Sequence, residues 1–242
     1  MSDPTNDYSY LAQNWAAVRE RVDAACHAAG RDPGDVSILP VSKTFGPDVV
    51  RAAMALGLRR FGENKVQELR SKSEALAGES VEWVVIGHLQ TNKAKDVARL
   101  ASEVQSLDRL DLADALQRRL EIEDRVIDVL IEVKTSPEDS KQGLPADQLL
   151  PFLSSLRAYD RLHVRGLMTL AEQSDDSEAV RACFRQLRQL RDAGIEQGHD
   201  LPRLSMGMSG DFPLAIAEGA TEIRVGTAIF GVRQFSKHTV PN

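Results

Sequence analysis

The stretch Val36-Ser37-Ile38-Leu39-Pro40-Val41, followed directly by Ser42-Lys43-Thr44, sets the pattern for the whole chain. A short, mostly apolar run of this kind is typical of a strand buried inside a parallel sheet. Gly46-Pro47 then marks a turn, and residues 48–56 return to the spacing of an amphipathic helix. The stretch therefore predicts a strand, a short loop and a helix, which together make one β/α unit.

The same unit recurs along the rest of the chain. Seven further short apolar runs follow the first one, at 59–61, 81–86, 104–107, 126–133, 162–167, 203–205 and 222–225. Segments with helical spacing separate the eight runs, at 48–56, 65–76, 92–100, 109–120, 147–156, 178–193 and 211–218. A further amphipathic helix at about 8–29, ended by Gly30, precedes the first run.

This alternation predicts an α/β fold, namely a single parallel (β/α)8 TIM barrel with an additional N-terminal helix, in preference to an open doubly wound sheet. The length of 242 residues agrees with it, because such barrels typically need about 250 residues. We assign residues 1–242 to one domain, with the leading helix at 8–30 and the barrel at 36–233.

Composition narrows the classes of function. Hydrophobic residues make up 42% of the chain and charged residues 27%, and the formal net charge is −6. A chain with this balance has no general attraction for nucleic-acid phosphates. We see no membrane span or signal peptide, and Cys26 and Cys183 are too few for a disulfide framework or a metal knuckle. We expect a cytoplasmic protein that binds neither metal, nucleic acid nor membrane.

Lys43 is the first candidate for chemistry, because it stands where the first predicted strand ends. Desolvation against apolar neighbours would lower the pKa of its ammonium group and free the amine to form an imine with an aldehyde. The alternative is an ordinary lysine that leaves the strand and meets solvent. Asn64 and His88 follow the second and third strands, so they belong to the same end of a barrel.

The loops after the seventh and eighth strands contain the residue types of an anion-binding site. Barrels of this type commonly bind phosphate there. Hydroxyl groups and glycines that let the backbone approach an anion are supplied by Ser205, Ser209, Thr227, Gly207, Gly210 and Gly226. Together with Lys43 they indicate a phosphorylated aldehyde, and pyridoxal 5'-phosphate meets both requirements.

Arg224 then becomes a candidate partner for the ring nitrogen of that cofactor. A guanidinium group donates a hydrogen bond and disfavours protonation of the pyridine, which makes the ring a weaker electron sink. The alternative is a structural arginine, paired with Glu222 or Asp211. Spacing in the sequence leaves both possibilities open.

Six ordered blocks of this sequence closely resemble one family, the YggS/PROSC family of pyridoxal 5'-phosphate homeostasis proteins. The blocks are Val41-Ser42-Lys43-Thr44, Phe61-Gly62-Glu63-Asn64-Lys65-Val66-Gln67-Glu68, Ile86-Gly87-His88-Leu89-Gln90-Thr91-Asn92-Lys93, Arg165-Gly166-Leu167-Met168, Ser205-Met206-Gly207-Met208-Ser209 and Ile223-Arg224-Val225-Gly226-Thr227-Ala228-Ile229-Phe230-Gly231. The similarity runs from about residue 36 to residue 233 and implies a barrel akin to the amino-terminal domain of bacterial alanine racemase.

The resemblance also implies roles for individual residues. Lys43 corresponds to the imine lysine, and Arg224 would face the pyridine nitrogen. The phosphate would be contacted by Ser205, the backbone around Met206, Gly226 and Thr227, while Asn64 and His88 would line the pocket. The implied function is to hold the cofactor and to supply or buffer it without robust catalysis, with apo enzymes that use the same cofactor as recipients.

Two other functions stay open. One is a slow amino-acid racemase that uses Lys43 on one face of the substrate and water or His88 on the other. A two-base racemase needs a second group such as a tyrosine, and we expect none of Tyr8, Tyr10 and Tyr159 to reach the site. The other is a protein that reports cofactor status to a partner. Lys141 is the second choice for a reactive lysine, and a closed barrel predicts a monomer.

Overall fold

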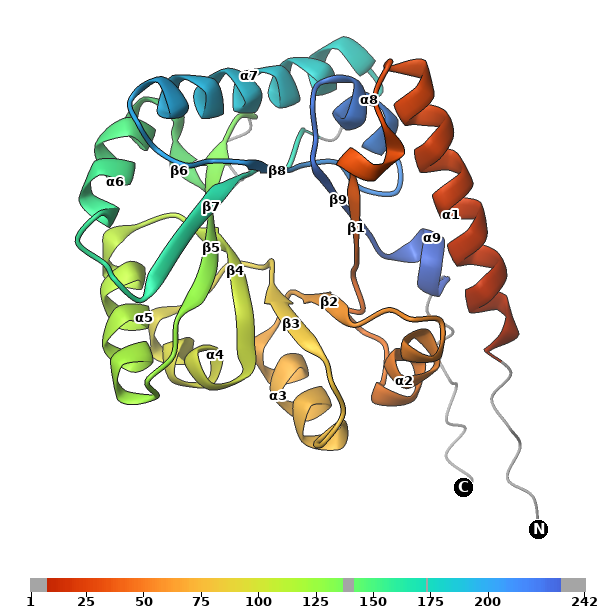
Figure 1. Cartoon of the computed structure of the whole chain (residues 1–242), viewed down its shortest axis with the longest axis horizontal. Coiled ribbons are helices and arrows are strands. Elements are labelled where there is room, and N and C mark those ends of the chain that lie inside the picture. The colour runs from red at the N-terminus through yellow and green to blue at the C-terminus, as the bar shows by residue number, and fades with distance from the viewer. Residues whose placement is uncertain (1–7, 137–141, 173, 232–242) are drawn as a thin grey trace, which may run out of the picture.

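Eight parallel strands form a ring in the computed structural model, which describes residues 8–136, 142–172 and 174–231 (Figure 1). The strands are hydrogen-bonded in the order β1-β9-β8-β7-β5-β4-β3-β2. A parallel bridge between Val41 and Gly62 joins the two ends of this series, and the backbone N–H of Ser42 donates to the carbonyl of Gly62 at 3.1 Å. The predicted TIM barrel is therefore confirmed.

The bounds of the strands agree closely with the predicted apolar runs. They are β1 (Ser37–Pro40), β2 (Arg60–Glu63), β3 (Glu82–Val85), β4 (Ala101–Leu107), β5 (Ile127–Lys134), β7 (Leu162–Met168), β8 (Arg203–Ser205) and β9 (Glu222–Val225). The short β6 (Leu144–Pro145) pairs only with β5 and lies outside the ring order. It was not predicted, because two residues are too few to show a period.

Helices surround the ring, and α1 lies along one side of it beside α8 and α9 (Figure 1). The helices are α1 (Ser9–Ala28), α2 (Pro47–Ala55), α3 (Val66–Ala75), α4 (Ala94–Leu100), α5 (Leu110–Ile122), α6 (Leu149–Leu156), α7 (Ser177–Glu196), α8 (Phe212–Ala217) and α9 (Thr227–Phe230). The additional N-terminal helix is thus confirmed, whereas the four-residue α9 was not predicted. The assignment of all of 1–242 to one domain stays a prediction.

Local sequence explains where several helices begin and end. Pro47 is the first residue of α2. Because N–H groups in the first turn of a helix have no partner within the helix, a proline at this position costs no hydrogen bond. The Asp176 side chain caps α7 by accepting from the N–H of Glu178 at 2.9 Å. Gly30 follows α1 with φ +67°, a left-handed conformation that suits glycine and ends the helix.

Gly166 in β7 lets two strands approach each other. Its φ is +154°, and a Cβ atom at this position would lie 2.0 Å from the carbonyl oxygen of Arg203 in β8. Since no side chain tolerates that distance, glycine is required for this pairing of β7 with β8.

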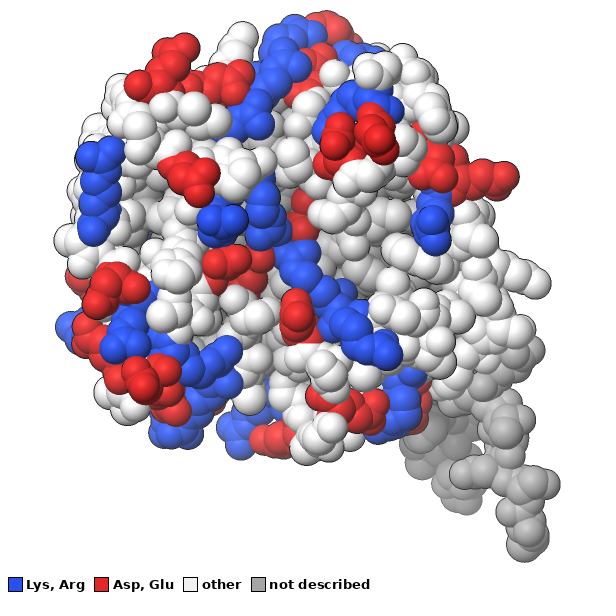
Figure 2. Space-filling view, in the orientation of Figure 1, with Lys and Arg blue, Asp and Glu red and all other residues white. Residues whose placement is uncertain are grey.

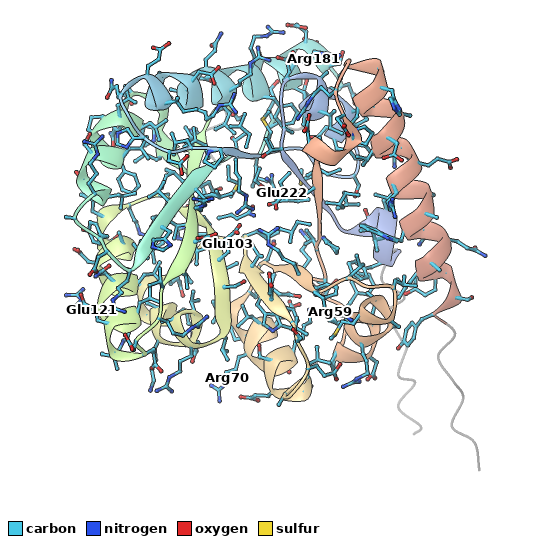
Figure 3. The ribbon with its side chains drawn as sticks, viewed as in Figure 1. Arg59, Arg70, Glu103, Glu121, Arg181 and Glu222 are labelled. Carbon is cyan, nitrogen blue, oxygen red and sulfur yellow. The ribbon has the colours of Figure 1, made fainter. Side chains whose placement is uncertain are left out.

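Charged side chains fill the amino-terminal end of the barrel, where apolar residues usually dominate. Glu103 on β4 and Glu222 on β9 are buried inside the ring (Figure 3). Arg60 donates to Glu103 at 2.8 Å and to Glu222, and Arg203 donates to the same two carboxylates at 2.7 and 2.9 Å. Gln105 adds hydrogen bonds to both carboxylates. The cluster therefore ties β2, β4, β8 and β9 together across the barrel.

The balance of charges keeps Glu222 ionised. Burial alone would raise the pKa of its carboxyl group, but the nearby Arg60 and Arg203 outweigh burial and lower it. A buried ion pair is strongly destabilised when one partner is removed, because the other charge stays buried without compensation.

The first prediction concerns this cluster. Glu222→Ala should lower the free energy of unfolding by about 3 kcal/mol, measured by urea denaturation at pH 7. Glu74→Ala is the matched control, since Glu74 forms an exposed pair with Arg70, and should cost at most about 0.5 kcal/mol. Equal losses in the two variants would contradict a supporting role for the cluster.

Acidic and basic side chains are interspersed over the face of the molecule shown in Figure 2. None of the described helices is both long and apolar enough to span a membrane.

Candidate functional site

A cavity of about 540 Å³ opens at the carboxyl ends of the strands, a size that suits a small organic ligand. Its walls come from residues at or beyond the ends of seven barrel strands. They are Val41, Lys43, Asn64, Ile86, Gly87, His88, Glu132, Gln142, Leu170, Met208, Ser209, Gly210, Arg224, Gly226 and Thr227. Most are loop residues, as expected of a TIM-barrel site.

Six of the eight residues predicted to bind the cofactor line this cavity. They are Lys43, Asn64, His88, Arg224, Gly226 and Thr227. The structure therefore brings together the lysine after β1, the polar residues after β2 and β3, and the glycine and threonine after β9.

Ser205 and Met206, which were also predicted to contact the phosphate, do not line this cavity. Ser205 is fully buried, and its hydroxyl group donates to Gln105 at 2.7 Å and accepts from Arg224 at 2.8 Å. The backbone N–H of Met206 donates to the carbonyl of Glu222 at 3.1 Å, and its side chain is buried in the core. Ser205 is the last residue of β8, and Met206 follows it directly. Ser209, further along the same loop, reaches the cavity instead.

Arg224 is buried yet borders the cavity. Its guanidinium group donates to the Ser205 hydroxyl at 2.8 Å and to the Thr169 carbonyl at 2.7 Å. Neither Glu222 nor Asp211, the alternative partners considered from sequence, forms an ion pair with it. Burial lowers the pKa of Arg224, and nearby carboxylates including Glu222 and Glu132 oppose that shift. An arginine in proteins nevertheless stays protonated, so the cavity has a fixed cation in its wall.

A chain of hydrogen bonds connects Arg224 with the charged cluster at the other end of the barrel. Glu222 accepts from Gln105, Gln105 accepts from Ser205, and Ser205 accepts from Arg224. Every member of this chain is buried. Buried partners therefore set the orientation of the guanidinium group.

Lys43 lines the cavity with an exposed side chain. The sequence left open whether this amine is buried at the strand end or meets solvent, and the structure shows the second; the apolar run ends at Val41, two residues before Lys43. The amine is accessible to a ligand in the cavity, and its position depends on the backbone around it.

Glu132 is a site residue that the sequence analysis missed. Its side chain is 4% exposed and lines the cavity from β5. Burial, and to a smaller extent Asp108, raises the pKa of this carboxyl group to about 7, while Arg224 opposes the shift. An acidic residue inside the apolar run 126–133 was the signal that could have identified it. The group is poised to be protonated near neutral pH.

His88 lies at the rim of the cavity. Its Nδ1 atom is 3.8 Å from a carboxylate oxygen of Asp108. Gly87 before it lies against the backbone of Asn64, where a Cβ atom would be 2.3 Å from the Asn64 carbonyl oxygen. This close approach brings the ends of β2 and β3 together at the cavity.

The glycine-rich edge of the cavity is held by α1. Arg21 of α1 donates to the carbonyl of Ser209 at 3.2 Å and stacks 4.7 Å above the Phe212 ring. Asn14 of the same helix donates to the carbonyl of Ile229 in α9 at 3.0 Å. The additional helix therefore contacts both segments that form this edge, the loop before α8 and the start of α9.

Comparisons with known proteins identify the family to which this chain belongs. The profile of the family described as "Alanine racemase, N-terminal domain" matches residues 7–234. The pyridoxal phosphate homeostasis protein of Aquifex aeolicus is 43% identical over 219 residues, which cover 90% of this chain and 96% of the relative. The chain belongs to this family of pyridoxal phosphate homeostasis proteins. The resemblance identified from the six sequence blocks is therefore confirmed.

Solved structures of this and related families share the barrel. PipY of Synechococcus elongatus, solved with PLP bound, is 34% identical and superposes with a TM-score of 0.82 over 91% of this chain and all of PipY. Alanine racemase of Clostridium difficile is 12% identical, with a TM-score of 0.74 over 95% of this chain and 58% of the racemase. The similarity to alanine racemase shows only that the two proteins share a fold.

The second prediction follows from Glu132. Because its pKa rises from 4.5 to about 7 on folding, protonation favours the folded state. The resulting stability is present in full below about pH 4.5 and is lost as the pH rises through about 7. Between pH 5 and pH 8 the free energy of unfolding of the wild type should fall by roughly 2 kcal/mol more than that of Glu132→Gln.

Thermal or urea unfolding of both proteins across this range measures the difference. Titration of the other groups is common to both proteins and cancels in the comparison. If the stability of the two proteins changed with pH in the same way, Glu132 would be ionised throughout this range and the prediction would be wrong.

Proposed function

We propose that this protein binds pyridoxal 5'-phosphate covalently through Lys43 and supplies or buffers the cofactor without robust catalysis. One observation carries the proposal: a single cavity holds an accessible primary amine, a fixed guanidinium group and a glycine- and hydroxyl-rich edge. The names of the relatives and the PLP bound to PipY support the same function.

The residues present fit the cofactor. Its aldehyde condenses reversibly with a primary amine, forming a C=N bond and releasing one water. Lys43 would supply that amine, and Arg224 would donate a hydrogen bond toward the ring nitrogen. Ser209, Gly226 and Thr227 would hold the phosphate at the cavity edge formed by the loops after β8 and β9.

The side chains around the cavity support storage over turnover. A guanidinium beside the ring nitrogen disfavours its protonation, which weakens the ring as an electron sink. None of the three tyrosines lines the cavity, and the Tyr159 hydroxyl donates to Asp114 at 2.8 Å, near the opposite end of β7. Among the described residues that line the cavity, His88 and Glu132 are, besides Lys43, able to move a proton, and they keep slow racemisation as the alternative activity.

We further propose a cytoplasmic monomer that passes the cofactor to apo enzymes. The eight described strands of the ring close on themselves, so the ring leaves no unpaired strand edge along which two copies would join. Cys26 and Cys183 are buried free thiols, which suits a reducing compartment. Lys141, the second choice for the reactive lysine, lies outside the described residues.

The third prediction tests covalent binding. Pyridoxal 5'-phosphate added to the wild type should give a visible absorption band, and borohydride should fix the adduct on Lys43. Lys43→Ala should lose the band, whereas Lys95→Ala, a change on the exposed face of α4, should keep it. Chiral assays on the same samples should detect at most slow racemisation. Absence of the band in the wild type, or rapid turnover, would overturn the proposal.

The fourth prediction distinguishes the two serines of the β8 loop. Ser209→Ala should weaken binding of pyridoxal 5'-phosphate about tenfold, since a hydrogen bond to a charged group is worth about 1.5 kcal/mol, and should leave binding of pyridoxal unchanged. Ser205→Ala should instead shift the absorption of the bound ring through Arg224. A loss specific to the phosphate in Ser205→Ala alone would restore the original assignment of that serine.

A further inference from the structure

The loop that carries Lys43 is held from one side by β2 and α3. Lys43 lies between β1 and α2, and its own side chain is exposed. Its two neighbours, Ser42 and Thr44, are each hydrogen-bonded to side chains of the next β/α unit. The placement of the amine therefore depends on what fixes these two residues.

Ser42 is fixed by a buried ion pair. Its hydroxyl group donates to the Oε1 atom of Glu63 at 2.6 Å, and the ammonium group of Lys72 donates to its carbonyl oxygen at 2.7 Å. Lys72 and Glu63 are themselves paired at 2.5 Å, and the three residues are at most 3% exposed. Burying two charges is costly unless hydrogen bonds compensate, and here those bonds go to the residue before Lys43.

Thr44 is fixed by Glu68. Its backbone N–H donates to a carboxylate oxygen of Glu68 at 2.6 Å, and this carboxylate lies 3.6 Å from Lys72. Thr44 has φ +71°, a left-handed conformation that a β-branched residue rarely adopts. Such a conformation persists only where surrounding contacts enforce it, and such residues cluster at functional sites.

We propose that Glu63, Glu68 and Lys72 are positioning residues that hold Lys43 in the orientation required for covalent attachment of the ligand. None of the three lines the cavity, so they act through the backbone on both sides of the lysine. The inference rests on the proposed function, in which the Lys43 Nζ atom bonds to the aldehyde carbon with release of one water. A displaced amine reacts slowly even when the ligand binds normally.

The test compares two ligands that differ only in the reacting group. Pyridoxal 5'-phosphate has the aldehyde, whereas pyridoxine 5'-phosphate has an alcohol in its place and binds without a covalent bond. In Glu68→Ala the rate of adduct formation should fall about tenfold, while the affinity for pyridoxine 5'-phosphate should change less than twofold. Glu74→Ala, an exposed change on the same helix α3, should alter neither quantity.

The buried pair needs a variant that leaves no unpaired charge. Lys72→Met alone leaves the Glu63 carboxylate buried without its positively charged partner. The double variant Glu63→Gln with Lys72→Met is therefore measured together with the single variant. The double variant should fold, bind pyridoxine 5'-phosphate and form the adduct slowly, as Glu68→Ala does. Its unfolding curve confirms that the comparison is made on folded protein.

The outcomes separate this inference from the proposed function. Equal losses for both ligands would show that the three residues merely maintain the cavity, and unchanged adduct formation in Glu68→Ala and in the double variant would equally overturn the inference. If the wild type itself forms no adduct, the proposed function fails instead.

Discussion

The buried carboxylate of Glu222 is the constraint on which the rest of the structure depends. It binds Arg60 of β2 and Arg203 of β8 and also accepts from Gln105 of β4. Without these cations a carboxylate could not stay ionised inside the barrel. The same carboxylate orders Gln105 and, through Ser205, the guanidinium group of Arg224. One interaction therefore stabilises the ring of strands and orients the most buried cation of the site.

Arg224 and Lys43, the lysine and arginine among the described residues of the cavity, are positioned in opposite ways. Arg224 is buried, and two hydrogen bonds hold its guanidinium group, one to the Ser205 hydroxyl and one to the Thr169 carbonyl. Lys43 extends from a loop, and its amine is accessible while its backbone neighbours are held by β2 and α3. A protein that captures a cofactor and later releases it needs an accessible amine, and a fixed guanidinium that discourages ring protonation limits side reactions. The buried Glu132 adds a group whose charge changes near neutral pH.

The periodicity of apolar residues was sufficient to predict the barrel, but it predicted only part of the site. The eight ring strands were found because each is a short apolar run between helical segments, and position at strand ends identified Lys43, Asn64, His88 and Arg224. It could not separate Ser205 from Ser209, because the Ser205 hydroxyl is engaged by Gln105 of β4 and Arg224 of β9, and contacts between distant strands do not show in the periodicity of the chain. Glu132 was missed because the run 126–133 also contains Asp128, and the sequence does not show which of the two acidic residues faces the cavity. The Glu63–Lys72 pair joins residues whose contact arises only from helix packing.

A crystal structure of the protein with pyridoxal 5'-phosphate would show directly how the cofactor is held. We expect continuous electron density from the Lys43 Nζ atom to the ligand, the ring nitrogen facing Arg224, and the phosphate against Ser209, Gly226 and Thr227. A ligand attached to another lysine, or one whose phosphate lies away from the loops after β8 and β9, would contradict this expectation.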